Sequence, residues 1–191
     1  MSRLWLYLAL LTAAPAGPAH AEPTAVEGRA VLLLTRALGY DRHLVKRVGE
    51  RLTIGVLVDA TAPQQERRAR EIQSYLRTLE SLSVRGVPVD CVVVPLEIDG
   101  LPLTERIQRL KLDVVLLVDP PGSWPLQQIF EATRSTETLS VSTDPNAVRE
   151  GASLAAAPRG NRIQLFVNLR ASRQEGASFS TELLQLAEVY R

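Results

Sequence analysis

Hydrophobic residues along this chain follow two alternating patterns. A short apolar run, which is typical of strands covered on both faces, occupies residues 52–58, and the segments 87–94, 114–118 and 138–142 also read as strands. Apolar residues at helical spacing occupy residues 25–38, 61–78, 103–110 and 124–133. Strands that alternate with helices in this way predict an α/β fold, in which a mostly parallel open sheet carries helices on both faces.

The pattern changes after the fourth predicted strand. Two strand-like runs, 152–157 and 162–167, flank a Pro-Arg-Gly-Asn turn and indicate a β-hairpin. In the second run Gln164, Phe166 and Asn168 alternate with apolar residues. Because side chains alternate between the faces of a strand, we expect these three to form the wetter, outward face of the hairpin.

The chain ends in a predicted final helix. Ser180 is its expected cap, and its apolar stripe runs from Leu183 to Tyr190. No internal repeat interrupts the chain. We therefore expect residues 22–191 to form a single α/β domain that closes with the C-terminal β-hairpin and the final helix.

Residues 1–21 have the composition of a secretory signal peptide. Arg3 precedes an apolar run at 4–14, and a small-residue Ala-His-Ala sequence ends at Ala21. The apolar run is shorter than the ~20 residues that a membrane-spanning helix needs. We therefore expect cleavage near Ala21, a mature chain that begins near Glu22, and a location in the periplasm.

The charges of the predicted mature chain are balanced. Without residues 1–21, which hold one arginine and no acid, 21 basic residues oppose 21 acidic ones. This balance gives no reason to expect strong binding to nucleic acid or to an anionic membrane. The hydrophobic fraction of 46% excludes a disordered chain.

Four acidic residues lie at or just beyond the carboxyl ends of the predicted parallel strands: Asp59, Glu97, Asp119 and Asp144. Ligands bind at that edge in open α/β sheets, and several carboxylates there could hold Mg²⁺ or Ca²⁺. Each acid also has a local explanation, since Asp144 precedes a proline as a helix cap does, and Asp59 and Asp119 fall in Pro-containing turns. We expect either a ligand edge or helix caps, and we assign no metal and no other cofactor.

Nucleophilic and nucleotide chemistry lack their usual residues. His43 is the only histidine after the leader, and no Gly-x-Ser-x-Gly motif is present. Cys91 stands among valines as a buried strand residue, where cysteine is an inert apolar group; an intermolecular disulfide or a reactive thiol are the alternatives. The turn after the first predicted strand has no glycine that would admit a phosphate. The sequence therefore predicts a protein that is not an enzyme.

Trp124 follows a Pro-Pro-Gly-Ser loop at 120–123. Its indole could line a ligand cleft or a partner surface, or it could anchor the helix that follows Pro125. Both interpretations are kept.

The C-terminal third carries a recognisable series of motifs. Leu-Ser-Val-Ser at 139–142 is followed by an acidic turn, a glycine and a hairpin, then by Arg-Ile-Gln-Leu-Phe-Val-Asn-Leu at 162–169 and a Ser-x-x-Leu-Leu-x-Leu-Ala segment at 180–187. This series resembles the YfiR/HmsC-like periplasmic family. The similarity extends more weakly over the whole mature chain, through the leading helix, the strand at 52–58 and the Val-Val-Leu-Leu-Val strand at 114–118. The aromatic-Pro motif and the disulfide cysteines of family members are absent.

The resemblance implies a regulator. Members of that family bind the periplasmic region of an inner-membrane diguanylate cyclase and hold it inactive, which limits cyclic-di-GMP signalling and biofilm formation. Such a protein needs a complementary surface and no catalytic group. As partner-binding residues we expect Trp124 together with Gln164, Phe166 and Asn168. A homodimer is left open, and no nucleic acid is expected as a partner.

Two other functions compete with regulation. The leader and the strand-end carboxylates also fit one lobe of a periplasmic substrate-binding protein, which would need a dimer or a shallow site to hold its solute. An exported hydrolase that uses Asp59 and Asp119 with a metal is the third hypothesis.

Overall fold

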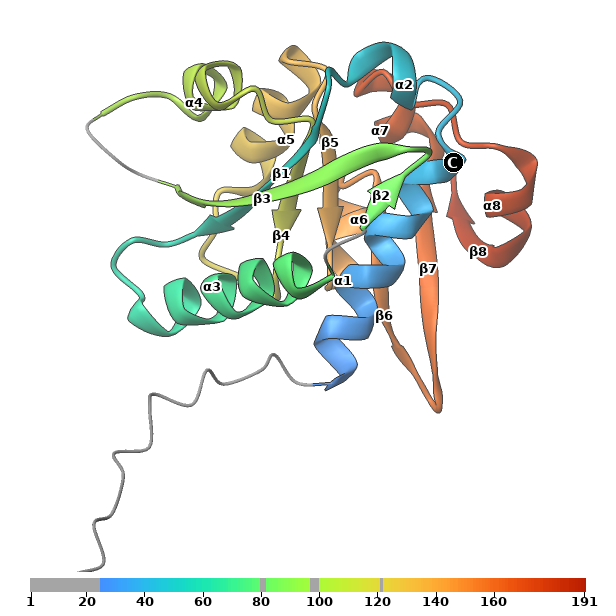
Figure 1. The fold of residues 1–191 in the computed structure, drawn as a ribbon, viewed down its shortest axis with the longest axis horizontal. Helices are drawn as coiled ribbons and strands as arrows, with labels where there is room; N and C mark the ends of the chain where they lie inside the picture. The colour runs from blue at the N-terminus through green and yellow to red at the C-terminus, as the bar shows by residue number, and fades with distance from the viewer. Residues whose placement is uncertain (1–24, 80–81, 97–99, 121) are drawn as a thin grey trace, which may run out of the picture.

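The fold is built on one eight-stranded sheet (Figure 1). The computed structural model describes residues 25–79, 82–96, 100–120 and 122–191, so the predicted signal peptide and Glu97 lie outside the described residues. In chain order the strands are β1 Leu52–Val58, β2 Ser83–Val84, β3 Val87–Pro95, β4 Val114–Leu117, β5 Leu139–Ser142, β6 Leu154–Arg159, β7 Arg162–Asn168 and β8 Ala187–Tyr190. They lie side by side in the order β2-β3-β1-β4-β5-β6-β7-β8.

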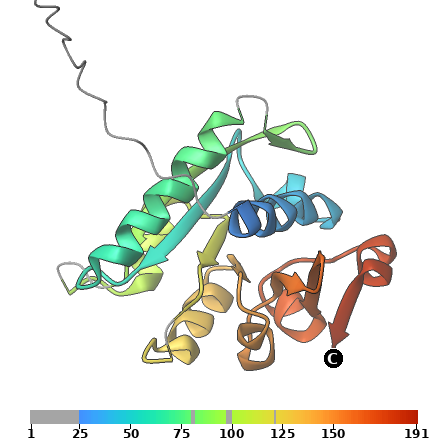
Figure 2. The same cartoon turned by 90° about the horizontal axis from the view of Figure 1, so that it is seen from below.

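Helices cover both faces of this sheet, as Figure 2 shows from below. The described helices are α1 Ala25–Ala37, the 3-10 turn η1 Leu38–Tyr40, α2 Leu44–Arg47, α3 Pro63–Thr78, α4 Leu103–Leu110, α5 Leu126–Ser135, α6 Asn146–Glu150, α7 Leu169–Gln174 and α8 Thr181–Leu186. Apolar side chains of α1 and α3 join one core cluster, and those of α4, α5 and α6 join a second. The predicted α/β class, the parallel sheet with helices on both faces and the hairpin are confirmed.

The strands read as continuous apolar runs because both of their faces are buried. In β1, Ile54 and Val56 belong to the first core cluster, whereas Leu57 belongs to the second. Gly55 lies between them, and a Cβ atom at that position would come within 2.6 Å of a methyl carbon of Leu112. Any larger residue at this position would have to displace the Leu112 side chain, where β1 and the segment before β4 approach each other.

The connections create a switch point between β1 and β4. The chain leaves β1 through α3 on one face to reach β3, and it returns through α4 on the opposite face to reach β4. β1, β3, β4, β5 and β6 pair in parallel, so their carboxyl ends share one edge, which we call the carboxyl edge, and their amino ends share the amino edge. In such sheets the crevice beside the switch point at the carboxyl edge is the usual ligand position.

The predicted final helix is wrong in its last turn. α8 ends at Leu186, and residues 187–190 form β8, which pairs in parallel with β7 from Leu165↔Ala187 to Asn168↔Tyr190. The apolar stripe that suggests helix also alternates at strand spacing, and the free edge of β7 decides between the two. The predicted cap Ser180 stands before α8, but its side chain makes no capping hydrogen bond.

Other short elements were not predicted. β2 forms a tight antiparallel hairpin with β3, and α6 fills the connection between β5 and β6. The helices in the described part of the chain include none that is long and apolar enough to cross a membrane.

Candidate functional site

The carboxyl edge carries the predicted acids, but two of them serve their own turns. The Asp59 carboxylate accepts hydrogen bonds from the Thr61 backbone N–H at 2.8 Å and from the Thr61 hydroxyl at 2.7 Å, and these bonds lower the pKa of Asp59. The Asp144 carboxylate accepts one from the Asn146 N–H at 2.9 Å. Both acids therefore have the local role of turn formation that their sequence context suggested.

Asp119 lies beside the turn of Asp144, since its N–H donates to the hydroxyl of Thr143 at 2.9 Å. Its carboxylate is 71% exposed and lies 3.3 Å from the Arg68 guanidinium, which also binds Glu27. Among the described residues, no three His, Cys, Asp or Glu side chains gather as metal ligands. In the described residues the edge therefore offers scattered carboxylates, each with its own partner.

A cavity of about 630 Å³ opens at the same edge, between α4 and α5. Apolar residues such as Leu96 and Leu103 line it together with Trp124 and Arg106. The Arg106 guanidinium donates hydrogen bonds to the carbonyl oxygens of Pro95 and Leu96, which holds the end of β3 against α4. The cavity lies where the switch point of the sheet predicts a ligand.

Trp124 packs into the second core cluster and is only 7% exposed. Its indole nitrogen is buried and has no hydrogen-bond partner among the described residues. The side chain therefore anchors the start of α5 and forms part of the cavity wall, which combines two of the roles considered for it. It does not protrude as a contact residue.

The expected outward face of the hairpin is also buried. Phe166 is 8% exposed and joins the second core cluster, because α6 and the side chain of Tyr190 cover that face. Asn168 accepts a hydrogen bond from the Ala171 N–H and donates one to the carbonyl oxygen of Val148, so it caps α7.

Gln164 is half-buried and donates hydrogen bonds to the carbonyl oxygens of Leu165 and Leu186. The prediction of a wet outward face on the hairpin is therefore wrong, since β7 has a packed layer on each side. Partner binding by Gln164, Phe166 or Asn168 stays a prediction.

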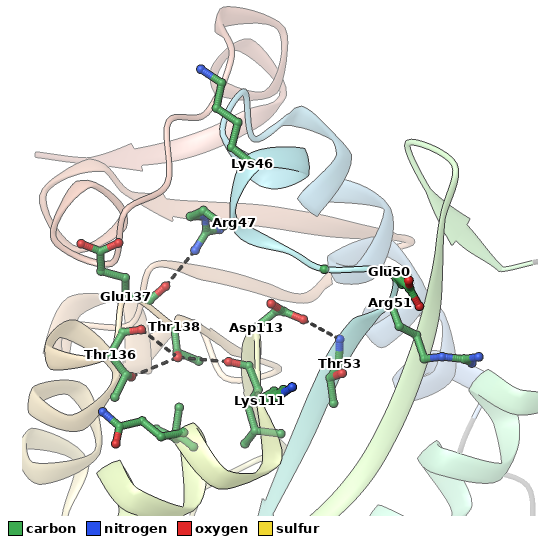
Figure 3. A pocket seen from close by; sticks show the side chains of 14 residues that line it. Lys46, Arg47, Glu50, Arg51, Thr53, Lys111, Asp113, Thr136, Glu137 and Thr138 are labelled. Atoms are coloured by element: carbon green, nitrogen blue, oxygen red, sulfur yellow. Dashed lines mark hydrogen bonds between the residues drawn. The ribbon is translucent and has the colours of Figure 1, made fainter.

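A second cavity, of about 780 Å³, lies at the amino edge (Figure 3). The Asp113 carboxylate lies near its centre and accepts a hydrogen bond from the Thr53 N–H at 2.8 Å. Burial raises the pKa of Asp113. The hydroxyl of Thr138 on the opposite wall bonds to that of Thr136 and to the carbonyl oxygen of Leu112.

Arg47 holds one side of this cavity together. Its guanidinium binds the Asp41 carboxylate at 2.8 Å and donates to the carbonyl oxygens of Glu137 and Glu175. These contacts join α2 to the loop before β5 and to the end of α7. Arg47 therefore has a structural role.

Glu175 is a buried carboxylate that the sequence analysis did not single out. It is 0% exposed and accepts hydrogen bonds from the hydroxyls of Thr133 and Ser140 at 2.6 and 2.7 Å, from the Ser140 N–H at 2.8 Å, and from the Ser153 hydroxyl. Burial nevertheless raises its pKa. The group ties α5, β5 and β6 to the end of α7.

Neither Cys91 nor His43 is placed to act as a nucleophile or as a base. Cys91 is buried, and desolvation raises the pKa of its thiol to about 12, so the reactive thiolate is absent at neutral pH. His43 is exposed, and its Nδ1 atom lies 3.1 Å from the carbonyl oxygen of Gly176. Neither residue has a partner that would activate it for catalysis among the described residues.

Comparisons with known proteins agree with the fold. No curated protein sequence matches the chain. A conserved domain protein from Vibrio cholerae O1 biovar eltor is similar in structure, with a TM-score of 0.58, 15% identity and coverage of 90% of this chain and 62% of that one. An ABC domain in complex with L-Trp from Streptococcus pneumonia has a TM-score of 0.54 and 13% identity, with coverage of 86% of this chain and 60% of that one.

These structural similarities show the fold alone, and the chain spans less than two thirds of either structure. The family comparison is more specific. The model of the YfiR/HmsC-like family matches residues 52–188, which begin with β1 and reach into β8. This protein therefore belongs to the YfiR/HmsC-like family.

Proposed function

We propose that this protein is a periplasmic binding protein that negatively regulates an inner-membrane signalling protein, a diguanylate cyclase, through protein–protein contact. The observation that carries the proposal is the family match, which runs from the start of β1 into β8. The isolated acids, the inert Cys91 thiol and the exposed His43 support a role in binding.

The contact surface needs exposed apolar side chains, because such anchors dominate interfaces. The largest exposed apolar side chains in the described chain include Tyr40, Val45 and Leu186, which are 39%, 53% and 63% exposed. They come from η1, α2 and α8, and backbone hydrogen bonds join η1 to the residues that lead into α8. We name Tyr40, Val45 and Leu186 the corner patch.

Backbone hydrogen bonds hold this corner together. The Arg42 N–H donates to the carbonyl oxygen of Ser178, and the Ser180 N–H donates to that of Tyr40. Asp41 and Phe179 form an isolated β-bridge at the same place. The corner patch is therefore presented on a fixed support, which lowers the entropy lost when a partner binds.

Photo-crosslinking in intact cells tests the proposal. A photoreactive amino acid placed at Val45 or Leu186 should capture a membrane protein with a cytoplasmic cyclase domain. The matched control carries the same amino acid at Glu131, an exposed residue of α5 on the other side of the sheet. Capture of no membrane protein from either corner position, or equal capture from all three positions, would overturn the proposal.

A small-solute-binding protein is the alternative, and the cavity of about 630 Å³ at the carboxyl edge favours it. A solute in that cavity would lie against Trp124, so the protein purified from its host should contain a bound small molecule. A Trp124→Ala variant that loses this molecule, together with a corner patch that captures nothing, would support the alternative.

A further inference from the structure

A third cavity lies where β7 and β8 end. It has a volume of about 550 Å³ and is lined by Leu169, Arg170, Arg173, Gln174 and Arg191. Three of its five lining residues are arginines, and none is acidic. It belongs neither to the carboxyl-edge cavity nor to the amino-edge cavity, and it shares no residue with the corner patch.

The fold brings these arginines together from two distant segments. α7 starts directly after β7, and Arg170 and Arg173 are three residues apart on it, so they share one helix face. β8 pairs with β7 in the register Asn168↔Tyr190, which places Arg191 level with the start of α7. The convergence therefore depends on β8, the strand that replaces the end of the predicted helix.

The arginine cluster is not neutralised within the protein. Arg170, Arg173 and Arg191 are exposed and form no ion pair or side-chain hydrogen bond within the described part of the chain. Other arginines are paired, as with Arg70 and Glu66. The side chains that line the cavity therefore carry a net positive charge.

A fourth arginine borders the same strand end. The Arg149 guanidinium lies 5.8 Å from the centre of the Tyr190 ring, and its Nε donates to the Tyr190 hydroxyl at 3.4 Å. Tyr190 itself donates to the Glu188 carboxylate, which also binds Arg159. The Glu188 carboxylate is therefore already shared between Tyr190 and Arg159.

We propose that this cavity binds a phosphate group that carries at least one negative charge. The planar guanidinium fork donates two parallel hydrogen bonds to phosphate oxygens, and several arginines around one hollow favour a multiply bonded anion over a single carboxylate. Leu169 and the arginine stems give the wall an apolar part. The phosphate is either a free anion or the headgroup of an anionic lipid.

Binding by the purified protein tests the inference without the proposed partner. Titration with inorganic pyrophosphate at low ionic strength, followed by calorimetry, measures the free-anion source. Co-sedimentation with phosphatidylglycerol-containing vesicles, compared with pure phosphatidylcholine vesicles, measures the lipid source. The double variant Arg170→Gln/Arg173→Gln should lose at least about tenfold in affinity for whichever probe binds, because two charge-assisted contacts are removed.

Two controls separate a site from general charge. The double variant Arg67→Gln/Arg77→Gln removes the same charge from exposed positions of α3, and it should bind like the unaltered protein. Arg170→Lys/Arg173→Lys keeps the charge but loses the fork geometry, so its affinity should fall between the other two. Binding of neither probe, or equal losses in the α7 and α3 variants, would overturn the inference.

Discussion

Replacement of Glu175 tests whether the buried carboxylate holds the C-terminal segment to the sheet. Glu175→Ala removes the acceptor for four hydrogen bonds and leaves the Ser140 N–H buried without one. An unsatisfied buried donor costs about 1–3 kcal/mol, and each of the three lost hydrogen bonds from the Thr133, Ser140 and Ser153 hydroxyls contributes about 1 kcal/mol. We expect the free energy of unfolding to fall by about 3–5 kcal/mol.

Glu175→Gln should lower the free energy of unfolding much less than Glu175→Ala. Its amide oxygen can accept from the Ser140 N–H and the Ser153 hydroxyl, while its NH₂ group faces the Thr133 and Ser140 hydroxyls. Thr133 can turn its proton to the carbonyl oxygen of Phe130, 3.1 Å away, and accept from the amide instead. The amide also carries no buried charge, so we expect a change within about 1 kcal/mol at neutral pH.

The burial of Glu175 also predicts that the free energy of unfolding depends on pH. Because burial raises the pKa of Glu175 above its ordinary value of 4.5, the native state holds a proton that the unfolded chain releases. The stability contributed by this group is therefore present below pH 4.5 and is lost as pH rises through the native pKa. The difference in stability between the unaltered protein and Glu175→Gln should change in this direction.

Urea denaturation at several pH values gives the free energies of unfolding of the unaltered protein, Glu175→Ala and Glu175→Gln from the midpoint and the slope of each transition. Glu175→Ala within about 1 kcal/mol of the unaltered protein would refute the reasoning, since the network would then contribute little. Equal losses for the Ala and Gln variants would also refute it, because the carboxylate charge would then be essential.

Three further predictions concern the sheet and its edges. Gly55→Ala should lower the free energy of unfolding by about 1–3 kcal/mol, because the new Cβ atom meets Leu112. The double variant Gly55→Ala/Leu112→Ala should lose less stability than the sum of the two single losses, because the smaller side chain makes room for the Cβ atom. Urea denaturation of the unaltered protein, the two single variants and the double variant checks this. The Cys91 thiol should resist a thiol reagent in the native protein at neutral pH and react after unfolding, and fast native labelling would contradict its burial. Arg47→Met should lower the thermal midpoint through the unpaired Asp41 carboxylate, and Asp41→Asn in the same chain should recover part of the loss.

The sequence predicts the central sheet well because its local signals agree with its packing. The runs at 52–58 and 87–94 become parallel strands, of which β1 is almost wholly buried and β3 mostly half-buried, and Cys91 is buried as its valine neighbours indicate. The turn roles of Asp59 and Asp144 also follow from local sequence, since each accepts hydrogen bonds from residues two positions ahead.

Long-range contacts decide the features that were not predicted. Residues 187–190 fit a helix or a strand equally by pattern, and only the edge of β7 selects the strand. Glu175 takes its role from donors 22 to 42 residues away in the chain. Phe166 is covered by α6 and β8, neither of which the apolar pattern revealed, so its face could not be recognised as internal.

The fold places contact and anion-binding features at different positions. The corner patch depends on η1, α2 and α8, whereas the arginine cavity depends on α7 and the end of β8. Variants of one should therefore leave the other unchanged. This separation allows partner binding and phosphate binding to be measured independently in the same chain.

The concentration of cyclic-di-GMP in cells tests the central claim most directly. Deletion of the gene should raise this concentration, and the rise should disappear when the cyclase captured from the corner patch is also deleted. A Val45→Asp variant, which places a charge on an exposed position of that patch, should remain folded and fail to lower the concentration again. An unchanged concentration after deletion, or full repression by the variant, would contradict regulation through this surface.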